Sequence, residues 1–118
     1  MENKYQKLGE KFKGIKKYLF EESKLRYPSV YSLQRAAEEI MLLLKVSEIG
    51  DEEFNLWSRR KIRFLDIFIA DLTGELEHDC EKRNKRYNHK WRVQERKLNE
   101  MLSEFETEFH EKLILGKE

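Results

Sequence analysis

The apolar residues of the N-terminal part of the chain recur every three or four positions. This spacing is that of one apolar seam on a helix, and the seam consists of Tyr5, Leu8, Phe12, Ile15 and Leu19. Gly9 and Gly14 fall within it, and each weakens a helix by up to about 1 kcal/mol relative to Ala. Tyr27-Pro28-Ser29 breaks the pattern, because the residue before a proline disfavours the helical conformation. The pattern predicts a first helix over residues 3–24.

A second amphipathic segment follows the proline. Ser29 or Ser32 can cap its first turn, and Gly50 follows its end near Val46. Its apolar face is broad and contains Leu33, Ala36, Ala37, Ile40, Met41, Leu43 and Leu44. The pattern predicts a second helix that starts near Ser29 or Ser32 and ends near Val46.

The third segment opens with Asp51-Glu52-Glu53, a capping residue followed by acids that suit the positive end of the helix dipole. A seam with steps of three and four, or their sums, then runs without a proline through Phe54, Trp57, Leu65, Phe68, Leu72, Leu76, Cys80, Tyr87, Trp91, Leu98, Met101 or Leu102, Phe105 and Phe109. A continuous helix of about 60 residues would be about 90 Å long. A periodic run of this length is typical of a coiled coil or another extended helix.

The seam is wide between residues 54 and 70 and narrows beyond Leu72. We therefore expect a single all-α domain over 1–118. A two-helix head (1–50) would pack on the start of a long charge-patterned helix (51–115), and the rest of that helix would project as a coiled-coil-like arm. Thr73-Gly74 offers the one plausible hinge, near Gly74. The alternative is a chain break at Gly74 and a closed helical bundle.

Composition narrows the class of protein. Charged residues make up 40% of the chain, yet the net charge is only +1, so the chain as a whole is not a polycation. Its lone cysteine, Cys80, excludes an internal disulfide and a C-x-x-C metal pair. The most apolar run, IMLLL at 40–44, is far shorter than the roughly 18 residues of a membrane span. We expect a cytoplasmic protein with no cofactor, no metal and no membrane contact.

Charge is concentrated in three successive blocks. Residues 71–81 carry five acids and no base (−5), residues 82–97 carry eight bases and one acid (+7), and residues 98–111 carry five acids and no Lys or Arg (−5). An antiparallel or staggered pair of such helices sets acid against base. The pattern therefore favours an antiparallel or staggered homodimer, and the alternative is a monomer with solvated charges of little energetic weight.

The basic block also suggests a nucleic-acid contact. Its cations cover about half of the helix surface opposite Tyr87 and Trp91, since successive residues turn by about 100°. They are Lys82, Arg83, Lys85, Arg86, Lys90, Arg92, Arg96 and Lys97. Such a face could bind phosphates in a salt-dependent manner. The acidic blocks on both sides oppose an extended polyanion, which makes this the second hypothesis.

Arg83-Asn84 and His89 resemble the R-x4–6-H motif of HEPN ribonucleases. In that all-α family the Arg and the His converge to cleave RNA, usually across a dimer, so the resemblance implies a ribonuclease that uses Arg83 and His89. Residues six apart on one helix point about 120° apart, which opposes their convergence. This is the third hypothesis.

The favoured interpretation is a non-enzymatic helical protein that binds a protein partner or itself through its seam and charge blocks. Aromatic anchors usually carry most interface energy, so the expected contacts are Trp57, Tyr87, Trp91, Phe105 and Phe109. The small size and the Lys/Glu-rich composition suit an adaptor, or an inhibitor or accessory regulator of a phage or mobile element.

Overall fold

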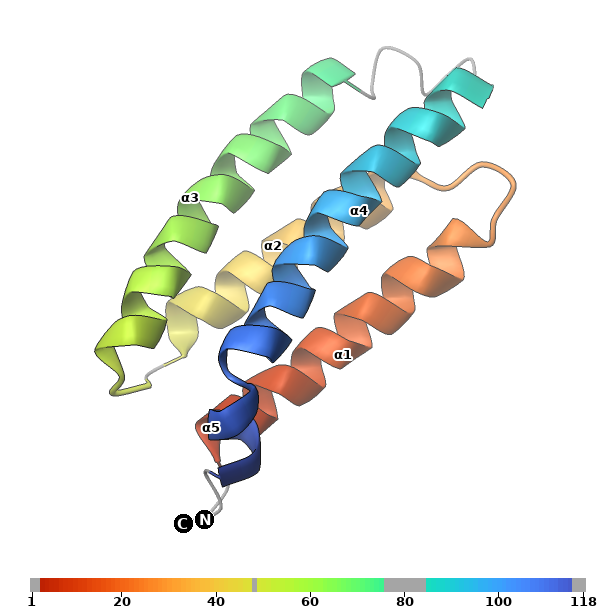
Figure 1. Ribbon diagram of the computed structural model, residues 1–118. Coiled ribbons are helices and arrows are strands. Elements are labelled where there is room, and N and C mark those ends of the chain that lie inside the picture. Colours follow the sequence, from red (N-terminus) through yellow and green to blue (C-terminus); the bar gives the residue numbers. More distant parts are fainter. Residues whose placement is uncertain (1–2, 48, 76–84, 116–118) are drawn as a thin grey trace.

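The computed structural model describes residues 3–47, 49–75 and 85–115 of the chain. These residues contain five helices and no strand (Figure 1): α1 (Lys4–Ser23), α2 (Val30–Val46), α3 (Glu52–Glu75), α4 (Lys85–Glu108) and α5 (His110–Leu115). The prediction of an all-α fold is confirmed. None of the described helices carries the long apolar stretch that crossing a bilayer requires.

Polar side chains cap the first three helices. The Asn3 carboxamide oxygen accepts a hydrogen bond from the Tyr5 N–H at 2.9 Å, and the Ser29 hydroxyl accepts one from the Tyr31 N–H at 3.1 Å. A carboxylate oxygen of Asp51 accepts from the Phe54 N–H at 3.1 Å. Each cap satisfies a backbone N–H that the helix itself leaves unbonded. The helix start predicted at Asp51 is therefore confirmed, and of the two caps predicted for the second helix, Ser29 or Ser32, Ser29 is the one observed.

Residues 51–115 do not form one long helix. α3 ends at Glu75, α4 begins at Lys85, and the two helices run antiparallel (Figure 1). The ring centroids of Phe54 and Phe105 lie 6.3 Å apart, whereas a straight helix would separate these residues by about 75 Å. The projecting coiled-coil-like arm is therefore wrong, and the closed bundle is the arrangement observed.

The error has a physical cause. Apolar steps of three and four mark one face of a helix. The same spacing continues when the chain reverses direction and the next helix packs its apolar face on the same core. Trp57 of α3 shows this, because its indole N–H donates to a Glu104 carboxylate oxygen of α4 at 3.1 Å. The hinge expected near Gly74 is not confirmed, because Thr73 and Gly74 lie in the last turn of α3, which continues to Glu75; residues 76–84 lie outside the described part of the chain.

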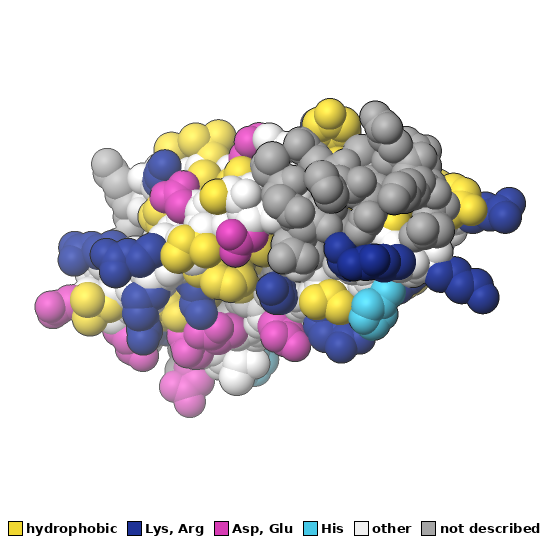
Figure 2. All heavy atoms as spheres, turned by 90° about the horizontal axis from the view of Figure 1, so that it is seen from above, with side chains coloured by type: hydrophobic (Ala, Val, Ile, Leu, Met, Phe, Trp, Pro, Cys, Tyr) yellow, Lys and Arg dark blue, Asp and Glu magenta, His cyan; other side chains and the backbone are white. Residues whose placement is uncertain are grey.

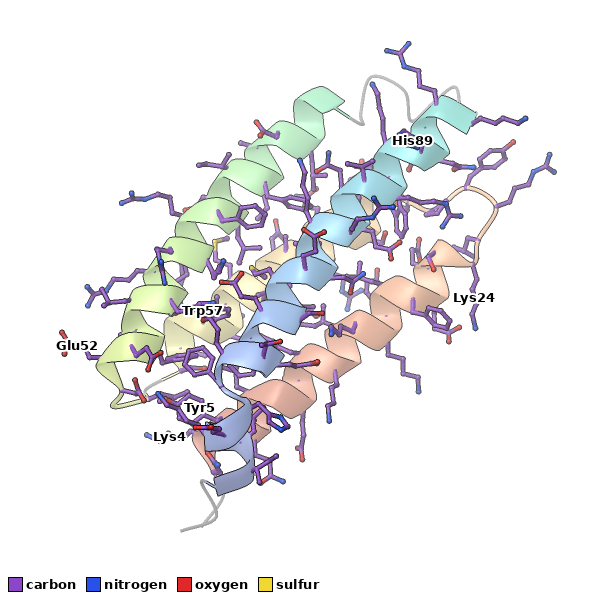
Figure 3. All side chains as sticks on the ribbon, viewed as in Figure 1. Lys4, Tyr5, Lys24, Glu52, Trp57 and His89 are labelled. Atoms are coloured by element: carbon purple, nitrogen blue, oxygen red, sulfur yellow. The ribbon has the colours of Figure 1, made fainter. Side chains whose placement is uncertain are left out.

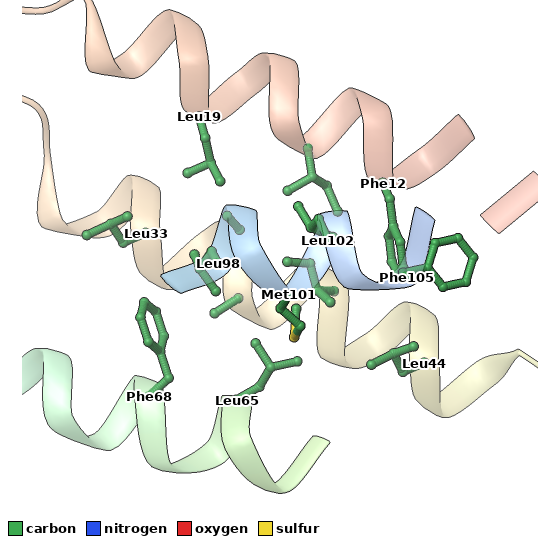
Figure 4. Close-up of a cluster of buried hydrophobic side chains, with 14 of the residues drawn as sticks. Phe12, Leu19, Leu33, Leu44, Leu65, Phe68, Leu98, Met101, Leu102 and Phe105 are labelled. Atoms are coloured by element: carbon green, nitrogen blue, oxygen red, sulfur yellow. The ribbon is translucent and has the colours of Figure 1, made fainter. Parts of the chain in front are cut away.

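One cluster of buried side chains fills the space between α1, α2, α3 and α4 (Figure 4). Every seam residue of α1 from Leu8 to Leu19 is buried, and Leu33, Ala36, Ala37 and Ile40 of α2 are fully so. Phe105 of α4 is also fully buried. Truncating such a phenylalanine to Ala typically destabilises a protein by about 3–5 kcal/mol. The amphipathic patterns of all four long helices are therefore satisfied within one chain.

A short clasp joins the start of α1, the start of α3 and α5. The Asn3 carboxamide donates to the Lys112 carbonyl at 2.8 Å, and the Lys112 ammonium donates to the Asp51 carboxylate. The bond from Lys112, together with the Phe54 N–H, lowers the pKa of Asp51 to about 2. The ring of Tyr5 stacks on that of Phe109 beside this ion pair, with centroids 5.5 Å apart.

Candidate partner-binding groove

The five aromatic residues predicted as partner contacts lie in the core of the monomer. Trp57, Tyr87, Trp91, Phe105 and Phe109 are each at most 2% exposed. Trp57 points from α3 toward α4 (Figure 3), and its ring centroid lies 5.6 Å from those of both Phe105 and Phe109. The contacts that the structure gives these rings come from the chain's own helices, so a surface for a partner has to be sought elsewhere.

Tyr87 and Trp91 fasten the loop between α1 and α2. The Tyr87 hydroxyl donates to the Pro28 carbonyl, and the Trp91 indole N–H donates to the Ser29 carbonyl at 2.9 Å. Without Tyr87 the Pro28 carbonyl would need water as a partner. The Ser29 carbonyl also accepts from the Ser32 N–H at 3.2 Å and from the Ser32 hydroxyl at 2.5 Å, so α4 adds a further donor to it. The aromatic residues of the basic segment thus hold the relative position of the two N-terminal helices.

The described part of the predicted phosphate-binding face lies on α4. It comprises Lys85, Arg86, Lys90, Arg92, Arg96 and Lys97, whereas Lys82 and Arg83 lie outside the described residues. Asn88 donates to the Arg26 carbonyl at 2.9 Å, and the Arg92 guanidinium donates to the Ser23 carbonyl at 3.2 Å. These bonds bring the cations of the α1–α2 loop, Lys24 and Arg26, next to the face. Seen from above, Lys and Arg side chains gather around a histidine on this side of the molecule (Figure 2).

His89, the second member of the HEPN-like pair, is an exposed residue of α4 near the Lys85 end (Figure 3). Its proposed partner Arg83 lies outside the described residues, so the structure contains no geometry for the pair. Within the described ranges, no group of three or more His, Cys, Asp and Glu side chains is placed to hold a metal ion.

A groove between α1 and α2 exposes apolar side chains. Leu42 and Val46 lie one turn apart on α2 and remain 61% and 63% exposed. Across from Leu42, Ile15 and Tyr18 of α1 complete a mainly apolar hollow of about 430 Å³. Scattered exposed apolar residues are ordinary on a protein surface, but Leu42 on the wall of a concave apolar hollow, with exposed Val46 one turn further along α2, indicates a binding surface.

Gly14 keeps this hollow open. It lines the α1 wall, and a Cβ atom built on it would meet no other atom within 4 Å. The hollow continues past Lys11 and Leu43 into a second one of about 210 Å³ that reaches Lys4 at the start of α1. The two hollows form one surface along α1, which we call the α1–α2 groove.

Charge is distributed unevenly along the α1–α2 groove. Lys4, Lys7 and Lys11 follow one another along its α1 wall, with spacings of three and four residues. At the other end Glu39 of α2 pairs with Arg35 at 3.8 Å, and the Arg35 guanidinium lies 6.0 Å from the centroid of the Tyr18 ring. One end of the groove is therefore basic, and the other is close to neutral.

A second groove lies between α3 and α4. Two hollows of about 240 and 280 Å³ meet there at Phe64 and Lys97. An ion pair between Lys61 and Glu104, 2.6 Å long, crosses it. Burial raises the pKa of Glu104, but the bond and the charge of Lys61, together with the bonds to Trp57 and Glu108, outweigh burial and hold the pKa below its usual value. Because its charges are matched within the chain, this groove is a weaker candidate for a partner.

No protein-family model, no curated protein and no solved structure matches this chain.

The sequence contains one feature that points to the α1–α2 groove, the width of the apolar face of the second helix, but this feature alone does not locate the groove. The apolar face of α2 is wider than its neighbours α1, α3 and α4 cover, and Leu42 adds to it beside Met41 and Leu43. Gly14 reads in the sequence only as a weak point in a helix. Its role as an opening depends on which residues lie opposite, and that is a property of the tertiary structure.

Proposed function

We propose that this protein is a non-enzymatic helical interaction module that binds a partner protein in the α1–α2 groove. The observation that carries the proposal is the pair of exposed side chains, Leu42 and Val46, beside an apolar hollow that Gly14 leaves open. An adaptor or a small regulatory protein acts by such binding, without chemistry of its own.

The shape of the groove favours a macromolecule over a small ligand. Small-molecule sites bury about 70–90% or more of the ligand surface. The α1–α2 groove is open, since Leu42 on its wall is 61% exposed, and it is long, since it follows α1 from Lys4 to Tyr18. A protein segment can cover such a surface along its whole length, and it would remove Leu42 and Val46 from water.

Site-specific photocrosslinking tests the proposal. A benzophenone amino acid replaces Leu42 in the full chain, which is expressed and irradiated in its native cells. We expect a discrete protein adduct that disappears when Gly14→Leu is added, because the leucine fills the hollow. Gly14→Leu should leave the fold intact, since the position is open and leucine favours a helix by about 0.8–1 kcal/mol more than glycine.

Ile67 provides the matched control. It is an apolar residue of α3 with 56% exposure, similar to that of Leu42, and it lies outside the groove. Crosslinking from position 67 should give adducts that Gly14→Leu does not change. Equal adducts from both positions, or an adduct from position 42 that survives Gly14→Leu, would contradict a function of the groove.

A nucleic-acid-binding accessory function is the second candidate, and one observation favours it. The bonds from Asn88 and Arg92 place the loop cations Lys24 and Arg26 beside the basic face of α4. Fluorescence anisotropy with a labelled single-stranded or duplex oligonucleotide tests this function. Binding through this face should weaken steeply with salt, and Arg96→Gln should reduce the slope of log K against log salt by about 0.7–0.9. Binding that does not weaken as the salt concentration rises would exclude the nucleic-acid-binding function.

A further inference from the structure

We infer that the occupant of the α1–α2 groove is an acidic amphipathic helix of about four turns, supplied by a different protein. The inference rests on the proposed function and adds the chemistry of the partner. The α1 wall extends over 14 residue steps from Lys4 to Tyr18, which corresponds to about 21 Å of helix.

A helix suits this groove better than an extended segment does. α1 and α2 satisfy their backbone groups internally, so the walls of the groove offer side chains and no row of free N–H and C=O groups. An extended peptide lying there would leave its own backbone unpaired, whereas a helix bonds its backbone within itself and presents an apolar face. Leu42, Val46 and Ile15 are spaced along the groove to receive that face.

The lysines select an acidic partner. In the described part of the chain, no carboxylate lies within ion-pair distance of Lys7, which lines the smaller hollow, or of Lys11, which lines both hollows. A partner helix seated on Leu43 would place one of its polar edges against these ammonium groups. Acidic residues at intervals of three and four on that edge would match the lysines, and electrostatic complementarity of this kind gives specificity and a faster association.

A second copy of this chain fits the groove poorly. On α3 the exposed apolar residues Leu56 and Ile67 share one face with Arg60 and Arg63, and those arginines would meet the lysines. Pairing two α1–α2 grooves in parallel would likewise bring lysine against lysine, and an antiparallel pair would set the lysines against the nearly neutral end, where Glu39 already pairs with Arg35. α5, which carries exposed Ile114, has six residues and is too short to fill the groove.

A helix display library tests the inference. Its members are about 15 residues long, with apolar residues fixed on one face and all other positions randomised. They are selected for binding to the full chain and counter-selected against the Gly14→Leu variant. We expect enriched members to carry Asp or Glu along one edge. Their affinity should fall about tenfold for Lys7→Glu/Lys11→Glu and remain nearly unchanged for the matched control Lys13→Glu/Lys17→Glu, which changes exposed lysines of α1 outside the groove.

Enriched helices without an acidic edge, or equal losses in the two double variants, would overturn the inference. So would the absence of any helix that distinguishes the wild type from Gly14→Leu. Self-association measured by light scattering, or binding to vesicles of anionic phospholipid, would identify a different occupant if Gly14→Leu abolished it. If the adduct from position 42 depends on Gly14 but the library shows no acidic preference, the proposed function stands and only the partner chemistry fails.

Discussion

Gly9 and Gly14 provide a matched pair of substitutions within one helix. Both lie in the interior of α1, where replacing Gly by Ala stabilises a helix by about 1 kcal/mol. A Cβ at position 14 meets nothing within 4 Å, whereas one at position 9 lies 3.2 Å from the Leu113 Cδ2 and 3.7 Å from the Phe105 Cε1. Gly14→Ala should therefore realise the whole gain, and Gly9→Ala should lose part of it by displacing Leu113.

Urea denaturation followed by far-ultraviolet circular dichroism measures the difference. For Gly14→Ala we expect the free energy of unfolding to rise by about 1 kcal/mol at an unchanged m-value, with a gain in Tm of about 4 °C. For Gly9→Ala we expect a gain smaller by about 0.5–1 kcal/mol, the cost of modest overpacking against a side chain that can move.

The Leu113→Ala variant tests whether the contact between position 9 and Leu113 causes the smaller gain of Gly9→Ala. In that background the neighbour of position 9 is removed, so Gly9→Ala should recover a gain close to that of Gly14→Ala. Equal gains for the two single variants would refute the reasoning, as would a Gly9→Ala deficit that persists without the Leu113 side chain. Either result would mean that α5 does not pack on α1 as described.

Three further predictions concern the clasp, the loop and the absence of catalysis. Asp51→Asn keeps the helix cap but removes the charge that pairs with Lys112. The pKa of Asp51 is lowered from its ordinary value of 3.8, which holds in the unfolded chain, to about 2 in the folded protein. The charge of Asp51 therefore stabilises the fold fully above pH 3.8, and this stabilisation is lost as the pH falls through about 2. The variant should be less stable by about 1 kcal/mol at pH 7 and approach the wild type only as the pH falls below about 2, and a deficit that does not change with pH would contradict this. Tyr87→Phe removes the hydroxyl that donates to the Pro28 carbonyl, so the free energy of unfolding measured in urea should fall by about 1 kcal/mol; no change would mean that water replaces the bond fully. RNA incubated with the purified protein should remain intact, and cleavage that Arg83→Ala/His89→Ala abolishes would establish the ribonuclease instead.

The local pattern of the sequence predicts most of the helices and little of their arrangement. Asp51 is identified as a cap, and the cap of α2 is narrowed to Ser29 or Ser32, because a short polar side chain next to an apolar period has a local function. The spacing of Leu8, Phe12 and Ile15 identifies the buried face of α1 for a similar reason. These features depend on neighbours within one or two turns, which the sequence places unambiguously.

The path of the chain after α3 depends on contacts between distant residues. The seam predicts that Trp57 and Phe105 are covered, but the same spacing results whether another molecule or the returning chain covers them. The α1–α2 groove could not be predicted from the sequence for the same reason, because Gly14 contributes to it only through its position opposite Leu42. In both cases the deciding quantity is a distance between residues that lie dozens of positions apart.

The fastening of the α1–α2 loop by α4 has a consequence for the order of events during synthesis. The Pro28 carbonyl receives its donor from a residue 59 positions later, and the Ser29 carbonyl, which also accepts from Ser32, receives a further donor from a residue 62 positions later. At about 5–20 residues per second, a ribosome needs several seconds to add that stretch, and water must serve the Pro28 carbonyl meanwhile. A nascent chain that stops before Lys85 contains every described residue of the groove but lacks the bonds with which α4 fastens the loop between α1 and α2. The final position of this loop is therefore a late event, fixed only after α4 has been synthesised.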